Sequence, residues 1–135
     1  MALFTRLGKY TSTALFIMRV GIGAMMILHG YPKLMGGPDK WASLGGNMTM
    51  FGIKSYHEIW GFLAAASEGV GGLLLILGLF FRPACFFMLC TMIVAVAHHL
   101  HAGESVKDAA EAIELGFVFM GLFLLGPGKY SIDKS

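Results

Sequence analysis

Charged residues are scarce in this chain of 135 residues. Only 13% are Asp, Glu, Lys or Arg, whereas 56% are hydrophobic, and about a quarter of the residues in an ordinary soluble domain are charged. The composition therefore excludes a typical soluble fold and indicates a membrane protein, with the lipid bilayer as its main partner. The formal net charge of +2 is too small to indicate that the chain binds nucleic acid.

Cysteine is also rare, since the chain contains only Cys85 and Cys90. Two residues five positions apart on a helix lie on different faces, so no disulfide within that helix is expected. We interpret both side chains as buried apolar thiols.

Four long apolar stretches fill most of the chain, over residues 13–31, 59–81, 83–101 and 109–125. A helix needs roughly 20 apolar residues to cross a bilayer, and the fourth stretch is at the short end of that range. Backbone groups in lipid must be hydrogen-bonded within their own segment, which selects helices. The sequence therefore predicts an all-α fold, a polytopic membrane four-helix bundle that forms a single domain over residues 1–135.

One long connection, residues 32–58, joins the first two helices. It mixes glycine and proline with Trp41, Met48, Met50 and Phe51, which is typical of a loop or short amphipathic segment at the membrane interface. In the second helix, Gly61, Ala65 and Gly69 form a row of small residues that permits close helix packing. Such rows also suit association with a second copy or another subunit.

The positive charges differ slightly between the two sides of the membrane. One side holds Arg6, Lys9, Arg82, Lys129 and Lys134, and the other holds Lys33, Lys40, Lys54 and Lys107. The positive-inside rule therefore predicts a multi-pass protein with both termini in the cytoplasm.

Ionisable residues lie within the apolar stretches or at their ends: Arg19, His29, Glu68, His98, His99, His101, Glu111 and Glu114. Such groups are costly in lipid and by default mark a functional site. Arg19 lies about 15 Å along its helix from His29, and Glu68 lies roughly 14 Å from Ile59. Their matched depth and opposite charge predict a buried ion pair between Arg19 and Glu68. The alternative is that Arg19 extends to the membrane surface.

The first helix carries a face made by Arg19, Gly23, Met26, His29 or Gly30, and Lys33. At the end of the bundle opposite the termini, this face meets the histidines of the third helix and the glutamates of the fourth. We therefore expect a pocket lined by His29, His98 and Glu114. The competing interpretation is that His99 and His101 contact headgroups and Glu111 only stabilises the start of its helix.

Three kinds of chemistry could use such a cluster. A histidine and a carboxylate can hydrogen-bond a quinone headgroup and exchange its protons. A path of titratable groups could carry protons or a small solute. A metal site is the weakest of the three, although not excluded, because the Glu-x-x-His motif of di-iron bundles is missing.

The chain resembles the DoxX family of small four-helix membrane proteins over nearly its whole length. The residues that carry this resemblance are Arg19, His29-Gly30-Tyr31-Pro32-Lys33-Leu34, Glu68-Gly69-Val70-Gly71-Gly72, Gly78-Leu79, Arg82-Pro83, His98, His99, Glu111, Glu114 and Gly126-Pro127-Gly128. The family takes its name from a quinol oxidase subunit, and relatives belong to thiosulfate:quinone oxidoreductases or to membrane complexes for oxidative stress. The resemblance implies a location in the bacterial inner membrane.

Together these features predict a quinone- or quinol-interacting subunit of a membrane redox complex, with either a redox partner subunit or a second copy. The residues expected to handle protons are His98, Glu114, Glu68 and Arg19. Those expected to hold the headgroup are His29, Lys33, His99 and Glu111. If the protein is an enzyme, it is expected to be an oxidoreductase component acting on quinol. The alternative is a non-catalytic scaffold or a carrier of small molecules.

Overall fold

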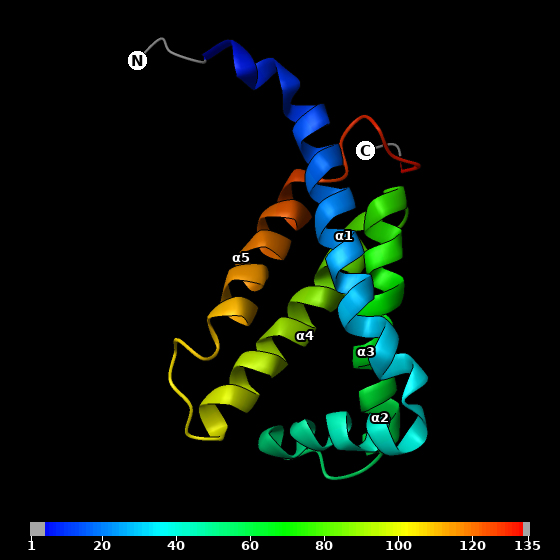
Figure 1. The fold of residues 1–135 in the computed structure, drawn as a ribbon, viewed down its shortest axis with the longest axis vertical. Coiled ribbons are helices and arrows are strands. Elements are labelled where there is room, and N and C mark those ends of the chain that lie inside the picture. The colour runs from blue at the N-terminus through cyan, green and yellow to red at the C-terminus, as the bar shows by residue number, and fades with distance from the viewer. Residues whose placement is uncertain (1–4, 134–135) are drawn as a thin grey trace.

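The computed structural model describes residues 5–133, and all regular secondary structure in this part of the chain is helical (Figure 1). In chain order its elements are the 3-10 helix η1 (Thr5–Tyr10), α1 (Thr11–Met35), α2 (Gly37–Gly45), the 3-10 helix η2 (Gly46–Phe51), α3 (His57–Leu77), α4 (Phe81–His101) and α5 (Ala110–Leu125). The predicted all-α fold is confirmed.

Within the described residues, three helical segments are long and apolar enough to cross a membrane: Arg6–Met35, His57–Leu77 and Phe81–His101. The polytopic architecture is therefore also confirmed. The last helix, α5, has 16 residues and so measures about 24 Å, which is shorter than the other three.

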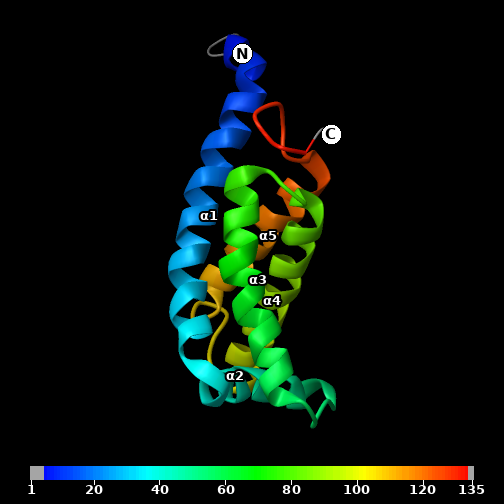
Figure 2. The same cartoon turned by 90° about the vertical axis from the view of Figure 1, so that its right-hand side faces the viewer.

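The long helices α1, α3, α4 and α5 follow one another as packed neighbours. Figures 1 and 2 show that the direction of the chain alternates along this series. Both ends of the chain lie at one end of the bundle, as the four-helix topology requires, while α2 and η2 lie across the other end. This segment occupies the expected position between the first two long helices, as a short helix rather than a loop.

Methionine and phenylalanine side chains dominate the core where α4 meets its neighbours. One connected cluster of buried residues joins all four long helices: Leu15, Met26, Leu75, Phe81, Ala84, Cys85, Met88, Met92, Ala112, Phe119 and Leu122. The predicted face of α1 is confirmed, because the buried residues of that helix are Leu15, Arg19, Gly23, Met26 and Gly30.

Glycines set the register between α1 and α3. A side chain at Gly30 would overlap the backbone of Gly69, and one at Gly23 would overlap the carbonyl oxygen of Gly72. The two helix backbones therefore approach as closely as small residues allow. The same device fixes α2, because a side chain at Gly61 on α3 would overlap the carbonyl oxygen of Trp41.

Two predicted helix ends are wrong by about one turn. The first helix continues through Pro32 to Met35. Proline removes one N–H donor from the helix, but neighbouring helices compensate for such a loss in a membrane bundle. The second helix ends at Leu77 because Gly78 adopts a left-handed conformation, with φ of +67°, which terminates helices without a side-chain clash.

Candidate functional site

A buried ion pair joins α1 to α3 in the half of the bundle that faces α2. The ammonium group of Lys33 lies 2.8 Å from Oε2 and 3.1 Å from Oε1 of Glu68. The Glu68 side chain is only 6% exposed, whereas that of Lys33 is 32% exposed. A carboxylate this deeply buried needs a partner, and Lys33 supplies it because α1 continues past Pro32.

The predicted ion pair between Arg19 and Glu68 is therefore wrong. Gly30 packs on Gly69, so Glu68 lies level with the end of α1. Arg19 is eleven residues away from Gly30 along that helix, or about 16 Å. The predicted depths of Arg19 and Glu68 were wrong because they were counted from helix ends that the structure places elsewhere.

Arg19 instead lies near the termini, fully buried. One of its terminal nitrogens, Nη2, donates a hydrogen bond to the carbonyl oxygen of Tyr130, and its guanidinium carbon lies 5.5 Å from the centre of the Phe16 ring. It also packs against Gly78 at the end of α3, where the helix dipole favours a positive charge. The alternative that Arg19 extends to the surface is also wrong.

The chain after α5 folds over the turn between α3 and α4. The N–H of Asp133 donates to the carbonyl oxygen of Gly78 at 2.8 Å, and Ile132 donates to Leu77 at 3.1 Å. The Asp133 carboxylate accepts hydrogen bonds from the first N–H groups of α4, at 3.0 and 2.8 Å, and so supplies the cap that this helix start requires. Arg19 belongs to this closure of the bundle.

A cavity of about 340 Å³ lies beside the Lys33–Glu68 pair, between α3 and α4. Its lining residues are Lys33, Leu44, Asn47, Met48, Trp60, Leu63, Ala64, Ser67, Glu68, Phe87, Cys90, Thr91, Val94 and Ala95. Leu63, Phe87 and Cys90 are also exposed on the outside of the bundle, so the cavity opens toward the surroundings of α3 and α4. The segment α2–η2 closes it at one end through Leu44, Asn47 and Met48.

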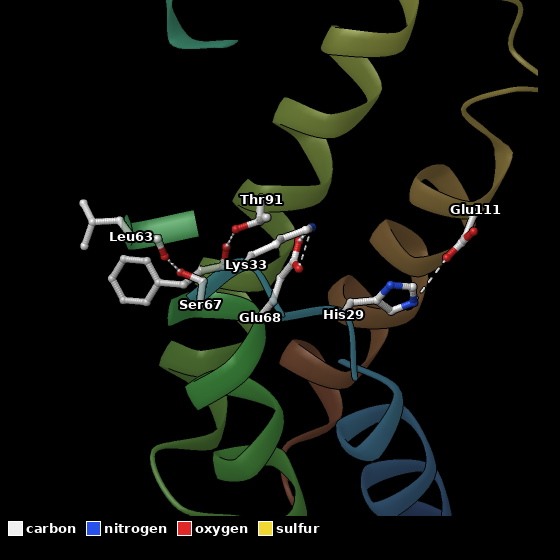
Figure 3. Close-up of polar contacts among 8 residues, drawn as sticks. His29, Lys33, Leu63, Ser67, Glu68, Thr91 and Glu111 are labelled. Carbon is white, nitrogen blue, oxygen red and sulfur yellow. Dashed lines mark hydrogen bonds and ion pairs between the residues drawn. The ribbon is translucent and has the colours of Figure 1, made fainter. Parts of the chain in front are cut away.

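Two hydroxyl groups lie near the ion pair on the walls of this cavity (Figure 3). Ser67 donates its hydrogen to the carbonyl oxygen of Leu63 at 2.7 Å, and Thr91 donates to that of Phe87 at 3.0 Å. Neither residue was among those predicted from the sequence to form the site. A signal was nevertheless present, because Ser67 is the only serine or threonine of α3 and Thr91 is the only one of α4, and polar residues in a span mark contacts or sites.

The predicted cluster of histidines and glutamates separates into smaller contacts. His29 Nε2 lies 3.6 Å from Glu111 Oε1 and so links α1 to α5, away from the Lys33–Glu68 pair (Figure 3). Nδ1 of His99 lies 2.6 Å from Glu104 Oε2 in the connection after α4. His98 and Glu114 are exposed, and neither lines the cavity.

A metal site needs several donor atoms that meet at one point. Within residues 5–133, no group of three or more His, Cys, Asp or Glu side chains is placed to hold a metal ion. Of the residues that we expected to form one site, the structure joins only Lys33 and Glu68 at a cavity.

This cavity can bind an apolar molecule and fix the polar end of that molecule. Its walls are mostly apolar, and its volume is at the lower end of the roughly 300–1,000 Å³ of small-molecule sites. The Lys33–Glu68 pair at its inner wall can donate hydrogen bonds, accept them and exchange protons. A few polar groups that converge in an apolar pocket are the usual composition of a ligand site.

Comparisons with known proteins agree with the membrane fold. The DoxX family profile matches residues 14–101. The chain is 30% identical to the inner membrane protein YphA of Escherichia coli, over 94% of this chain and 93% of that protein. It is 32% identical to an uncharacterized protein of Haemophilus influenzae, over 95% and 94% of the two chains. No solved structure matches. Because the chain resembles an inner membrane protein over nearly its full length and has several membrane-spanning helices, it is an integral protein of the inner membrane. It belongs to the DoxX family.

Proposed function

We propose that the protein binds the ring of a quinone or quinol in the cavity between α3 and α4, as a subunit of a membrane redox complex. The observation that carries this proposal is the position of the Lys33–Glu68 pair on the inner wall of a mostly apolar cavity. A buried ionisable pair in a membrane protein marks a functional site by default.

The dimensions and surface of the cavity support a ring ligand with a long apolar tail. A volume of about 340 Å³ holds a substituted ring but not an isoprenoid tail. The tail would leave through the opening beside Leu63 and Phe87, which are exposed on the outer faces of α3 and α4. Those faces meet lipid in a spanning bundle, so a molecule dissolved in the bilayer can reach the cavity sideways.

The lining residues suit proton exchange. Oxidation of a quinol to a quinone releases two electrons and two protons. The carboxylate of Glu68 can accept the two protons one after the other and release each of them to solvent beside Lys33, whose side chain is 32% exposed, while Lys33 keeps the site hydrogen-bonded. The hydroxyl, amide, ammonium and carboxylate groups of the cavity do not carry electrons, so in this proposal the two electrons pass to a redox centre on a partner subunit.

The binding proposal can be tested with the two cysteines. Cys90 lines the cavity and is exposed, whereas Cys85 is buried in the core. We expect N-ethylmaleimide to alkylate Cys90 in the folded protein and to spare Cys85. A fully substituted decyl-benzoquinone should slow the alkylation of Cys90. If a saturating concentration leaves the rate unchanged, the cavity does not bind the ring and the proposal is wrong.

Extraction of lipid from the purified protein gives an independent test. Mass spectrometry should find isoprenoid quinone with the wild-type protein. It should find less with Leu63→Trp, which fills the cavity. Leu73→Trp is the matched control, because Leu63 and Leu73 both lie on α3 and are 48% and 49% exposed, but only Leu63 lines the cavity. Equal quinone in both variants would contradict the assignment to this cavity.

The subunit role requires a separate measurement, because binding alone also fits a carrier of lipophilic molecules. Mass measurement in mild detergent should reveal an additional protein that holds a redox cofactor. A monomer that binds quinone with no such partner would support the carrier function instead.

A further inference from the structure

The hydrogen-bonding capacity of the cavity is unevenly divided between donors and acceptors. A hydroxyl group has one hydrogen to donate and two lone pairs that accept. The hydrogens of Ser67 and Thr91 are already directed to the carbonyl oxygens one turn earlier in their helices, at 2.7 and 3.0 Å. Both residues line the cavity, and a hydroxyl whose hydrogen is engaged in this way can offer a ligand only acceptor lone pairs.

The ion pair supplies a donor. The ammonium of Lys33 has three hydrogens, and Glu68 accepts hydrogen bonds from it at both carboxylate oxygens. One hydrogen of Lys33 is left for a ligand. Around the ion pair, the cavity thus combines one free ammonium hydrogen with the lone pairs of Ser67 and Thr91 and the remaining lone pairs of the Glu68 carboxylate, and Asn47 adds an amide that can act in either sense.

We propose that Ser67 and Thr91 make this cavity selective for a ligand whose ring carries an O–H group, a hydroquinone or another phenol, over one whose ring carries only acceptor oxygens. This inference rests on the proposed binding of a ring ligand. A phenolic oxygen can accept from Lys33 while its hydrogen is donated to Ser67 or Thr91. A quinone oxygen has no hydrogen, so it faces lone pairs there unless a hydroxyl gives up its helix hydrogen bond.

The expected selectivity follows from the worth of one hydrogen bond. A neutral hydrogen bond contributes on the order of 1 kcal/mol net, which corresponds to about fivefold in affinity. We therefore expect 4-nonylphenol to bind about fivefold more tightly than 4-nonylanisole, in which a methyl group replaces the phenolic hydrogen. The measurement is the concentration of each probe that halves the rate of Cys90 alkylation in the purified protein.

The variants assign the selectivity to the two hydroxyls. In the double variant Ser67→Ala, Thr91→Val the preference for the phenol should fall, through weaker binding of the phenol and with little change for the anisole, because only Glu68 and Asn47 then remain to accept the phenolic hydrogen. The variant Ser67→Ala, Thr91→Ser keeps a hydroxyl group at position 91, so it should bind the phenol more tightly than the double variant with valine does. Thr13→Val and Ser43→Ala, which lie on α1 and α2 and do not line the cavity, should keep the wild-type preference. A decyl-benzoquinol should exceed its quinone by a similar factor under anaerobic conditions.

The outcomes separate the inference from the function on which it rests. Equal binding of phenol and anisole to the wild-type protein, or a preference that is undiminished in the double variant, overturns the inference and leaves the proposed binding intact. A failure of all probes to protect Cys90 overturns the proposed function and the inference together. A phenol preference without a quinol preference supports the role of the hydroxyls and identifies the natural ligand as a phenol other than quinol.

Discussion

Removal of either member of the Lys33–Glu68 pair should destabilise the protein, and by unequal amounts. Lys33→Ala leaves the carboxylate of Glu68, which is only 6% exposed, without a partner. Breaking a buried pair in this way costs about 3–5 kcal/mol. Glu68→Ala leaves an ammonium group whose side chain is 32% exposed and can turn outward, so we expect a cost of roughly 1–2 kcal/mol.

Thermal unfolding in detergent, followed by circular dichroism at 222 nm, measures this difference. A loss of 3–5 kcal/mol lowers the Tm of a chain of this size by roughly 10–15 °C.

Charge reversal provides the control. The double variant Lys33→Glu, Glu68→Lys should recover part of the stability that each single variant loses, since opposite charges again meet at the same place. The exchange Arg19→Glu, Glu68→Arg should recover nothing, because Gly30 packs on Gly69 and so holds these residues apart. Equal Tm values for Lys33→Ala and wild type at neutral pH, or rescue by the Arg19 exchange, would refute the reasoning.

Three further predictions concern the packing and the two ends of the bundle. Gly61→Ala should displace α2 and lower stability by about 1–3 kcal/mol in thermal unfolding, because the added methyl overlaps the carbonyl oxygen of Trp41; Gly21→Ala, with nothing within 4 Å, should be neutral or slightly stabilising. Asp133→Ala removes the cap of α4 and should cost about 1 kcal/mol, with faster hydrogen exchange at the start of that helix. The pKa of Asp108 lies below its usual value of 3.8. The main cause is the hydrogen bond that its carboxylate accepts from the backbone N–H of Ser105, and the second is the one that it accepts from the Ser105 hydroxyl. This carboxylate thus stabilises the turn before α5 above pH 3.8 and ceases to do so as the pH falls through its lower folded value, which hydrogen exchange of the turn should detect.

The helices could be predicted from the sequence because their signal is local. Long apolar runs leave few alternatives in lipid, and the spacing of Arg19, Gly23, Met26 and Gly30 already marks the inward face of α1. The pairing of charges could not be predicted because it depends on register. Lys33 was expected on the face of the first helix but not as the partner of Glu68, whereas the structure places it in the last turn of α1, opposite Glu68.

The cavity could not be predicted from the sequence either, for a related reason. Lining residues such as Ser67 and Thr91 become neighbours only when α3 and α4 pack with a particular relative rotation. Histidines were predicted to form the site because free histidine titrates near neutral pH. The structure places His98 on the surface of the bundle, which is an ordinary position for a histidine at the end of a spanning helix. Residue type indicated which groups could do chemistry, and only the packing indicated which of them face a cavity.

The two cations Arg19 and Lys33 of α1 illustrate this difference. Arg19 is fully buried, donates to the backbone of Tyr130 and lies against the end of α3, where it closes the bundle. Lys33 is partly exposed, is neutralised by Glu68, has one ammonium hydrogen that Glu68 does not take and lines a cavity. Both positions are costly in lipid, so cost alone does not identify a functional residue. The useful criterion is whether the charged group retains hydrogen-bonding capacity next to a space that a ligand can enter, and of these two cations Lys33 lines such a space.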